Sequence, residues 1–312
     1  MNQRKPILRL DFADALGKGI KNNNFFHNLL SRHYEVQIVD APDVLIFTHY
    51  GHRNRLYSCK KIYTTQERYP PNWKECDAAV TPAYENHEHA YYYPYFAAFR
   101  QLGDLVRTLP VDVDRILDER RGFCSFLHKY VDKTVAKRTQ FFHELNRRKK
   151  VDAGGPALNN MGYLVPDGEE AKMNFLAGYR FHLAFENRLC PGWTTEKFTD
   201  PFRVNSVPIY WGDQRALRWF NPKAFVNVMD FRNFSECCDY ILHLENSPEA
   251  YGKMLAEPAF QNNQVPTELD ENRLLEFLVR EIERAGVPAA RKRWFWPFTR
   301  WRLVKRDRIH GE

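Results

Sequence analysis

The chain has 312 residues, of which 44% are apolar, and a formal net charge of +7 at pH 7. This length exceeds what one hydrophobic core usually supports, so two domains are expected, and the apolar share is enough for sizeable cores. The sequence contains no run of 18 apolar residues, which excludes a membrane-spanning helix. The excess of Lys and Arg favours anionic partners such as nucleotide phosphates or a membrane surface.

The cysteines and the amino-terminal segment indicate in which cellular environment the protein is expected. Six cysteines, at positions 59, 76, 124, 190, 237 and 238, follow neither a zinc spacing nor a dense disulfide pattern. The segment 1–19 lacks an apolar stretch long enough for a signal peptide. We therefore expect mostly reduced, buried thiols and no secretion by that route.

The first part of the chain alternates short apolar runs with helical segments. Strands are predicted at residues 7–10, 36–39, 44–47, 61–65 and 78–80, with a helix at 25–34. The segment 90–99 is typical of a surface or crossover element, and its six aromatic residues indicate either packing or stacking on a glycan. Residues 104–119 are charged and lack an apolar period, so we place the inter-domain connection there.

A second β/α set follows, with a strand predicted at 123–127 and a helix near 136–149. The segment 181–212 then predicts a strand, a loop with Pro191 and Gly192, a helix that opens at 194–197, and a returning strand at 207–211. This alternation predicts an α/β fold with two Rossmann-like domains. The expected boundaries are 1–115, 116–262, and a carboxy-terminal helix and tail at 263–312.

The predicted helix start at 194–197 has the chemistry of a diphosphate site. A first helical turn offers unpaired backbone N–H groups and the positive end of the helix dipole, and Lys197 adds a full charge. Glu186, Asn187 and Glu196 lie where open α/β sheets collect ligands, and they are able to accept hydrogen bonds from ribose or sugar hydroxyls. An isolated TEK, by contrast, is typical of an ordinary solvated helix cap.

The surrounding motifs resemble those of the α-1,3/1,4-fucosyltransferases. The chain has FEN at 185–187, GWTTEK at 192–197 and VPIYWG at 207–212, where the family has FEN, GY-x-TEK and VPIYWG. The run NPKAFVNVMDF at 221–231 is similar to a further family motif. The resemblance covers residues 120–240 well and the first 110 residues only in outline.

The resemblance implies a GT-B architecture, in which two Rossmann-like domains face a central cleft. The amino-terminal domain would bind the acceptor and the carboxy-terminal domain GDP-fucose. The implied reaction is inverting transfer of L-fucose from GDP-β-L-fucose to a glycan hydroxyl, O3 of GlcNAc, without a metal or another cofactor. Animal members carry an amino-terminal membrane anchor, so its absence here implies a bacterial-type, cytoplasmic form.

The resemblance also assigns roles to individual residues. Arg138, in AKRTQFF, resembles the family's diphosphate-binding arginine, and a guanidinium suits bidentate phosphate contact. Trp193 stands where the family commonly has Tyr and would form an aromatic wall. The expected donor site consists of Arg138, Glu186, Asn187, Trp193, Thr195, Glu196 and Lys197.

The general base is expected after a strand of the first domain. Glu67 is the only carboxylate in the segment 63–72 (YTTQERYPPN), although Gln66 falls on the family position if no gap is allowed. The alternative interpretation of Glu67 is a solvated loop acid.

Two other constellations have the composition of metal sites. Asp112 and Asp114 spell the DxD of metal-dependent glycosyltransferases, but they lie in a charged connector, where solvated charges are the simpler interpretation. A second set, which consists of Glu85, His87, Glu88 and His89, has the spacing to line one face of an extended segment. No further ligands support a metal at either place.

The segment 291–308 (RKRWFWPFTRWRLVKRDR) interleaves basic and aromatic residues, which suits an anionic membrane surface, for example at the inner membrane face. The alternative is a flexible basic end.

Two other functions stay open: a GT-B transferase that uses another nucleotide sugar, and a non-enzymatic binder of anionic polymer or membrane. The second leaves the TEK and PIYWG motifs unexplained, and we expect no nucleic-acid partner.

Overall fold

The computed structural model describes residues 4–14, 16, 21–67, 69–82, 86–98, 102–120, 122–131 and 135–289. The chain divides into two compact units: unit 1 comprises Met1–Pro94 and Thr267–Glu312, and unit 2 comprises Tyr95–Pro266. The predicted tail at 291–308 lies outside the described residues, as do Glu85 and Phe99.

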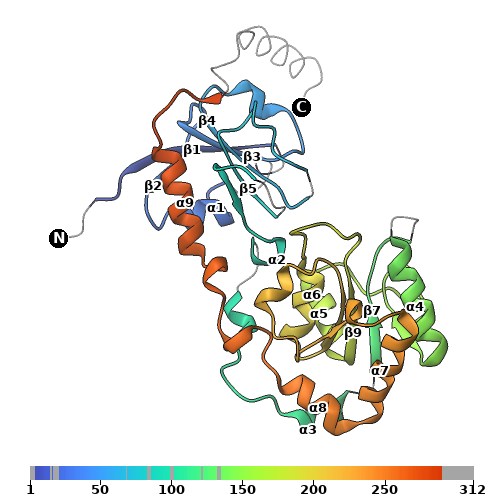
Figure 1. Cartoon of the computed structure of the whole chain (residues 1–312). Helices are drawn as coiled ribbons and strands as arrows, with labels where there is room; N and C mark the ends of the chain where they lie inside the picture. The colour runs from blue at the N-terminus through green and yellow to red at the C-terminus, as the bar shows by residue number, and fades with distance from the viewer. Residues whose placement is uncertain are drawn as a thin grey trace. The chain divides into compact units, whose positions relative to one another are not determined.

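Unit 1 is built on a parallel sheet with the strand order β2-β1-β3-β4-β5-β6 (Figure 1). Its strands are β1 (Ile7–Ala13), β2 (Glu35–Ile38), β3 (Val44–Phe47), β4 (Lys60–Thr64), β5 (Ala78–Thr81) and β6 (Ala90–Tyr92). Every residue of β3 and β5 is buried, which is typical of parallel strands covered on both faces. The helices are α1 (Phe25–Leu30) and α9 (Glu271–Glu283), and short 3-10 helices span Arg53–Leu56 and Thr267–Leu269.

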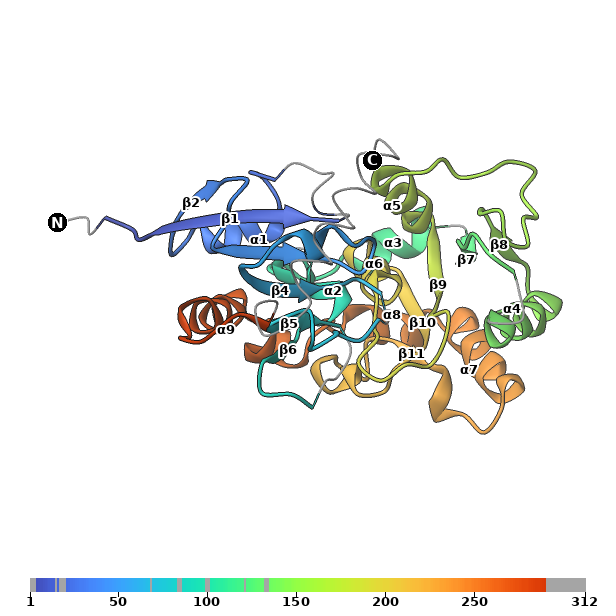
Figure 2. The same ribbon diagram turned by 90° about the horizontal axis from the view of Figure 1, so that it is seen from above.

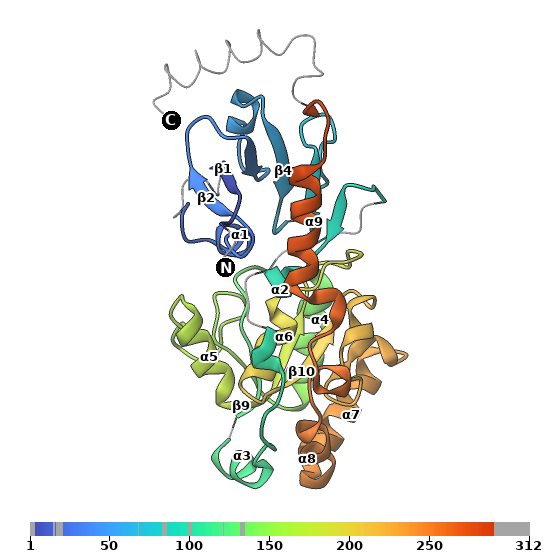
Figure 3. The same cartoon turned by 90° about the vertical axis from the view of Figure 1, so that its left-hand side faces the viewer.

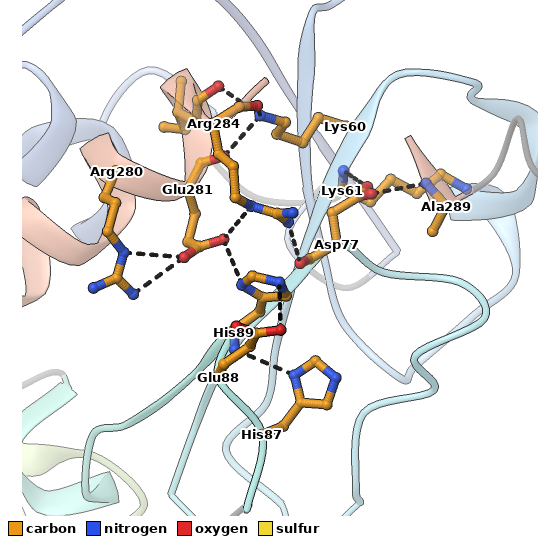
Figure 4. Close-up of polar contacts among 11 residues, drawn as sticks. Lys60, Lys61, Asp77, His87, Glu88, His89, Arg280, Glu281, Arg284 and Ala289 are labelled. Atoms are coloured by element: carbon orange, nitrogen blue, oxygen red, sulfur yellow. Dashed lines mark hydrogen bonds and ion pairs between the residues drawn. The ribbon is translucent and has the colours of Figure 1, made fainter. Parts of the chain in front are cut away.

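Helix α9 carries the end of the described chain back to unit 1 (Figure 3), where it packs against α1. Its buried residues Leu274, Phe277, Leu278 and Glu281 follow a helical period and so form one face. The ammonium of Lys60 closes the carboxyl end of the helix by donating to the carbonyls of Glu281, Ile282 and Arg284 at 2.6–2.7 Å (Figure 4).

Unit 2 is built on a second parallel sheet, with the order β11-β10-β9-β7-β8. Its strands are β7 (Gly122–Phe126), β8 (Val151–Ala153), β9 (Tyr179–Phe185), β10 (Val207–Trp211) and β11 (Val226–Asn227). Its helices are α2 (Tyr95–Ala98), α3 (Val113–Glu119), α4 (Ala136–Arg148), α5 (Glu169–Ala177), α6 (Glu196–Arg203), α7 (Phe234–Asn246) and α8 (Pro248–Ala256). Short 3-10 helices span Leu102–Leu105, Ala216–Trp219, Val228–Asp230 and Gln261–Asn263.

The helices of unit 2 cover both faces of its sheet. Figures 1 and 2 show α4 and α7 on one side of the strands, and α5 and α6 lie on the other side in Figure 1. On the first side, alternate strand residues such as Phe181, Leu183 and Phe185 pack against Phe141 of α4 and Ile241 of α7. On the other side, Phe198 of α6 packs on Tyr210 of β10 with ring centroids 4.1 Å apart.

Most predicted elements agree with the structure to within a few residues, but two interpretations were wrong. The segment after 90 does contain a strand, since β6 pairs in parallel with β5 through Tyr91 and Tyr92. The charged segment 104–119 is not the inter-domain connection, because it belongs to unit 2 and contains α3. The units therefore divide at Pro94 rather than near residue 115, and α9 returns to unit 1.

All six cysteines lie in the described part of the chain and are free thiols, as expected. Five of them are buried, and Cys190 is half-buried. In the described ranges, no helix combines the length and the apolar content needed to cross a bilayer.

Candidate active site

The order of the unit 2 strands defines where a ligand is expected. From β7 the chain moves to the edge strand β8 and then returns to the other side of β7 to form β9. Adjacent parallel strands whose connections leave in opposite directions form a switch point, and open α/β sheets bind ligands outside the carboxyl ends of such strands. The carboxyl ends of β7 and β9 therefore mark the candidate site.

A cavity of about 490 Å³ lies at this edge. Segments that follow β7, β8 and β9 contribute to its wall, as do residues near the starts of α4, α5 and α6. The polar side chains that line it are His128, Lys129, Tyr130, Arg138, Asp167, Glu169, Lys172, His182, Asn187, Glu196 and Lys197. Four of the predicted donor-site residues thus meet in one cavity, namely Arg138, Asn187, Glu196 and Lys197.

Glu186 and Thr195 lie behind this wall and support Lys197. Both are buried, and Glu186 accepts hydrogen bonds from the Thr195 backbone N–H at 2.7 Å and from the Thr195 hydroxyl at 2.9–3.0 Å. The Thr195 oxygen in turn accepts from the Lys197 ammonium at 3.2 Å, and that ammonium lies 3.6 Å from the Glu196 carboxylate. A chain of hydrogen bonds therefore fixes Lys197.

The charges of this group influence one another. Burial raises the pKa of Glu186, although the charge of Lys197 and the N–H of Thr195 act in the opposite direction. Burial lowers the pKa of Lys197, but the carboxylates of Glu186 and Glu196 more than offset this effect, so its pKa lies above the ordinary value. Lys197 is therefore a cation at neutral pH.

Two of the amides that we expected to be free at the start of α6 are already in use. Thr195 is the N-cap residue; its N–H donates to Glu186, and its side chain accepts from the Lys197 N–H at 3.3 Å. Two amides that the sequence offered to a diphosphate are thus satisfied within the protein. The helix dipole and the Lys197 side chain remain as the attraction for an anion at this position.

Arg138 is the second cation of the cavity and is almost fully buried, with 2% of its surface exposed. Its guanidinium contacts three neutral acceptors: Nδ1 of His128 and Oδ1 of Asn187, both at 2.9 Å, and the carbonyl of Tyr130 at 2.8 Å. Asn187, which we expected to bind a sugar hydroxyl, instead uses its amide oxygen to hold Arg138. These contacts orient the guanidinium.

Sequence reasoning missed His128, which determines how Arg138 is held. Burial, followed by the charge of Arg138, lowers the pKa of His128 well below its usual value, so the imidazole is neutral. Because Arg138 donates to Nδ1, the proton of His128 lies on Nε2, which faces the Leu183 carbonyl at 3.3 Å. Gly155 packs directly on this residue, since a Cβ at that position would lie 2.4 Å from the His128 carbonyl oxygen.

Two further polar residues of the wall were not predicted. Lys172 of α5 lies 2.5 Å from the carboxylate of Asp200, which is fully buried on α6. His182 of β9 contacts the Ser125 hydroxyl at 2.8 Å, and burial lowers its pKa to about 3. No local motif marks either residue as part of the site, because their partners come from other elements of the fold.

We expected Trp193 to line the cavity, but it is not among the lining residues. It is 9% exposed, and its ring packs against Tyr95 with centroids 5.9 Å apart. Tyr95 of α2 is one of the aromatic residues on the wall. The indole thus supports the aromatic wall from behind.

Glu67 belongs to unit 1, where it follows β4 and is exposed. Its backbone N–H donates to the Thr65 hydroxyl at 2.9 Å. Burial, followed by the charge of Glu67, raises the pKa of Tyr50. Gln66 is exposed as well. A second carboxylate, Asp14, follows β1, but it is buried and accepts from the Arg53 N–H at 2.9 Å.

The two possible metal constellations have structural roles. Asp112 is the N-cap of α3 and accepts from the Arg115 N–H at 3.1 Å. His89 lies 3.1 Å from Glu281, and His87 stacks on Trp73 with centroids 3.5 Å apart. Within the described residues, no group of three His, Cys, Asp or Glu side chains is placed to hold a metal ion.

Comparison with models of known protein families identifies the family of this chain. Residues 121–261 match the model of the carboxy-terminal part of glycosyltransferase family 10 (fucosyltransferase), and residues 10–99 match that of the α-(1,3)-fucosyltransferase FucT amino-terminal domain. The chain belongs to glycosyltransferase family 10, the fucosyltransferases. The family-10 match contains all of the predicted donor-site residues.

Individual relatives agree with the assignment. An α-(1,3)-fucosyltransferase FucT of Helicobacter pylori is 41% identical over 138 residues, which are 44% of this chain and 28% of that protein. An α-(1,3)-fucosyltransferase B of Drosophila melanogaster is 30% identical over 127 residues, which are 38% of this chain and 29% of that protein. The chain thus spans less than a third of the length of these curated relatives.

The solved structures extend the likeness over nearly the whole fold. The crystal structure of an α1,3-fucosyltransferase with GDP-fucose superimposes with a TM-score of 0.75 and 25% identity, over 92% of this chain and 94% of that one. Another α1,3-fucosyltransferase structure gives a TM-score of 0.76 at 24% identity. The predicted GT-B fold with two parallel-sheet domains is thereby confirmed.

Proposed function

We propose that the chain is an inverting α-1,3-fucosyltransferase, which moves L-fucose from GDP-β-L-fucose to O3 of a GlcNAc residue in a glycan acceptor. The observation that carries the proposal is the meeting of Lys197 and Arg138 in one cavity at the switch point of the unit 2 sheet. Two fixed cations at a site of this kind suit the diphosphate of a nucleotide sugar. The likeness to an α1,3-fucosyltransferase with GDP-fucose supports this choice of donor.

The reaction requires a base at the acceptor and cations at the leaving group. The acceptor oxygen forms a bond to C1 of fucose on the face opposite to GDP, while the bond from C1 to the β-phosphate oxygen breaks. In this proposal Glu67 accepts the hydroxyl proton, and the departing diphosphate carries away the bonding electron pair. Lys197 and Arg138 stabilise that negative charge, so the proposal includes no metal ion.

The remaining predicted residues have supporting roles in this proposal. Glu186 and Thr195 hold Lys197 as a cation through the hydrogen bonds described above. Asn187 holds Arg138, and Glu196, which lines the cavity, is placed to accept hydrogen bonds from donor hydroxyls. Trp193 fixes Tyr95 of the aromatic wall.

Two measurements test the proposal. Thermal unfolding with GDP, UDP and CDP identifies the base of the donor, because a ligand at 100 times its dissociation constant stabilises the folded state by about 2.7 kcal/mol. An array of glycan acceptors incubated with GDP-fucose then tests transfer. Lys197→Ala should abolish GDP binding and transfer, whereas Lys253→Ala, an exposed lysine of α8 that pairs with Glu249, is the matched control. Stabilisation by UDP alone would indicate another nucleotide sugar.

The tail at 291–308 supports a separate proposal about location. We propose that its basic and aromatic residues attract an anionic membrane surface, which would place the enzyme at the inner face of a membrane where lipid-linked glycans are available. Sedimentation with phosphatidylglycerol vesicles tests this. A protein that ends at residue 290 should stay in the supernatant, while the full chain should pellet at low salt.

A further inference from the structure

A second cavity of unit 2, with a volume of about 340 Å³, lies away from the donor cavity. Its wall consists of residues 104–112, part of α3, the end of α6, Asn205 and Ala259. The segments of α3 and α6 precede β7 and β10, so the cavity lies toward the amino-terminal edge of the sheet, whereas the donor cavity lies at the carboxyl edge. We call it the distal cavity, and the proposed transfer reaction makes no use of it.

Three arginines line the distal cavity, namely Arg107, Arg115 and Arg203. Two carboxylates belong to the same wall, and each of them already has a partner. Asp104 pairs with Arg203 at 2.5 Å, and Asp112 accepts the Arg115 backbone N–H at 3.1 Å as the N-cap of α3. The wall therefore carries more positive than negative charge.

The guanidinium of Arg107 has a donor that the protein leaves unused. Its Nη1 is buried and has no hydrogen-bond partner among the described residues. Burial lowers the pKa of Arg107, and the charge of Glu257 acts in the opposite direction without offsetting this effect. A partly buried guanidinium of this kind gains free energy from an anion in the cavity that it lines.

The backbone of Arg107 is fixed by one side chain. Its N–H donates to Oδ1 of Asn263 at 2.8 Å, and its carbonyl accepts from Nδ2 of the same residue at 2.7 Å. Asn263 has a φ of 51°, a left-handed conformation that asparagine tolerates better than most residues. Because both backbone groups of Arg107 are held, less conformational entropy is lost when a ligand binds its side chain.

Arg120 adds positive charge behind the distal cavity. Its guanidinium donates to three neutral acceptors, the backbone carbonyls of Tyr179, Val204 and Asn205. Burial lowers the pKa of Arg120, and the charge of Arg115 acts in the same direction. An anion in the distal cavity would therefore also offset the repulsion between these two arginines.

We propose that the distal cavity binds a phosphate monoester group, which the guanidinium groups of Arg107, Arg115 and Arg203 hold. The planar guanidinium fork matches phosphate oxygens in geometry and charge. Phe202 and Leu109 belong to the same wall, and Leu109 is 78% exposed, so the group esterified to the phosphate would find apolar surface beside the arginines. The volume suits a small ligand. The ligand is thus a small organic phosphate or the headgroup of a phospholipid.

The experiment uses the full chain with labelled isoleucine and leucine methyl groups, which are followed by NMR. The methyl groups of Leu105 and Ile116 report on the distal cavity, and those of Leu127 report on the donor cavity. The probes are glycerol phosphate and dioctanoyl phosphatidic acid, and glycerol is the matched control without phosphate. Saturable shifts of Leu105 and Ile116 with glycerol phosphate would identify a small organic phosphate, and shifts with phosphatidic acid alone would identify the lipid headgroup.

Substitutions of the arginines test how the phosphate is held. Arg107→Gln removes the guanidinium and should weaken binding about 10- to 100-fold, the range of a charge-assisted hydrogen bond. Arg115→Gln changes an exposed residue of α3 and should weaken binding about 2- to 5-fold, so it decides the question even where Arg107→Gln fails to fold. Arg232→Gln changes an exposed arginine of unit 2 that pairs with Glu236, and it should leave binding unaltered.

The proposal would be overturned if neither phosphate shifts the methyl groups of Leu105 and Ile116, or if the shifts are confined to Leu127. Equal shifts with glycerol and glycerol phosphate would have the same meaning, as would equal affinities of the wild type and the folded arginine variants. Because the measurement involves neither GDP nor sugar transfer, its outcome is independent of the proposed function.

Discussion

The hydroxyl of Thr195 lies within 3.0 Å of both carboxylate oxygens of Glu186, and the N–H of the same residue donates to one of them. One side chain therefore caps α6, satisfies a buried carboxylate and accepts from the ammonium of Lys197. The hydroxyl group of residue 195 is therefore more important than the shape of its side chain.

Replacement of this hydroxyl should weaken both the fold and the donor site. Thr195→Val removes a helix N-cap, which costs about 1 kcal/mol, and the hydroxyl's hydrogen bond to a buried carboxylate, which costs about 1–3 kcal/mol. Thermal unfolding should show a lower melting temperature, and GDP titration should show weaker binding because Lys197 loses a contact. Thr195→Ser retains the hydroxyl and should behave as the wild type. Equal melting temperatures of the Val and Ser variants would contradict this role.

The buried histidines beside the donor cavity should make unit 2 sensitive to acid. Burial lowers the pKa of His182 to about 3, and that of His128 lies well below its usual value, whereas histidines in the unfolded chain titrate near 6.5. Between these values the unfolded state binds more protons, so the free energy of unfolding falls as the pH decreases below about 6.5. The slope approaches on the order of 1 kcal/mol per pH unit for each histidine.

Urea unfolding at about pH 7, 6 and 5 measures this dependence before most carboxylates titrate. His182→Gln should reduce the slope by one histidine's share, while His243→Gln, which changes an exposed residue of α7, should leave it unaltered. An identical slope in the His182 variant and the wild type would show that this imidazole does not take up a proton on unfolding in this range.

The identity of the base can be tested in unit 1 without disturbing the donor site. Glu67→Gln removes the proton acceptor but keeps its size, and it should reduce turnover by about 10²- to 10⁴-fold with unchanged GDP affinity. Glu35→Gln, which changes a carboxylate of the exposed edge strand β2, is the matched control, and Gln66→Ala tests the neighbouring position. Turnover close to the wild-type rate in Glu67→Gln would contradict its role as the base. Asp14, the buried carboxylate that follows β1, would then be the next candidate.

Local patterns predicted the elements of the fold and part of the site. The alternation of apolar runs gave the positions of β1, β3, β7, β9 and β10, because parallel strands are short, buried and apolar. Arg138 and Lys197 were recognised because they stand in family motifs. His128 carried a weaker signal, since it closely follows a predicted strand as Glu186 does, but only the topology shows that these two strands are neighbours.

Contacts between distant segments could not be read from the sequence. The return of α9 to unit 1 depends on side chains far from it along the chain, such as Lys60 and His89. Trp193 was placed on the cavity wall by its family position, whereas packing puts it behind Tyr95. In both cases the deciding interaction is tertiary, and no local period encodes it.

The attachment of α9 gives a last prediction. Glu281 is buried on this helix, and its carboxylate lies 3.1 Å from Nδ1 of His89, 2.9 Å from Nε of Arg284 and 3.1 Å from the guanidinium of Arg280 (Figure 4). Glu281→Gln removes the charge that these groups share. Loss of one member of a buried pair costs about 3–5 kcal/mol, but both arginines are partly exposed and able to regain water, so about 1–3 kcal/mol is expected.

Hydrogen exchange of the α9 amides measures this effect directly, because local opening of the helix should become more frequent than in the wild type. Glu276→Gln changes an exposed carboxylate on the same helix and should leave exchange unaltered. If exchange of α9 is equally slow in Glu281→Gln and Glu276→Gln, the apolar residues Leu274, Phe277 and Leu278 suffice to hold the helix. Faster exchange in the Glu281 variant alone would show that the buried carboxylate fastens the carboxy-terminal helix to the sheet of unit 1.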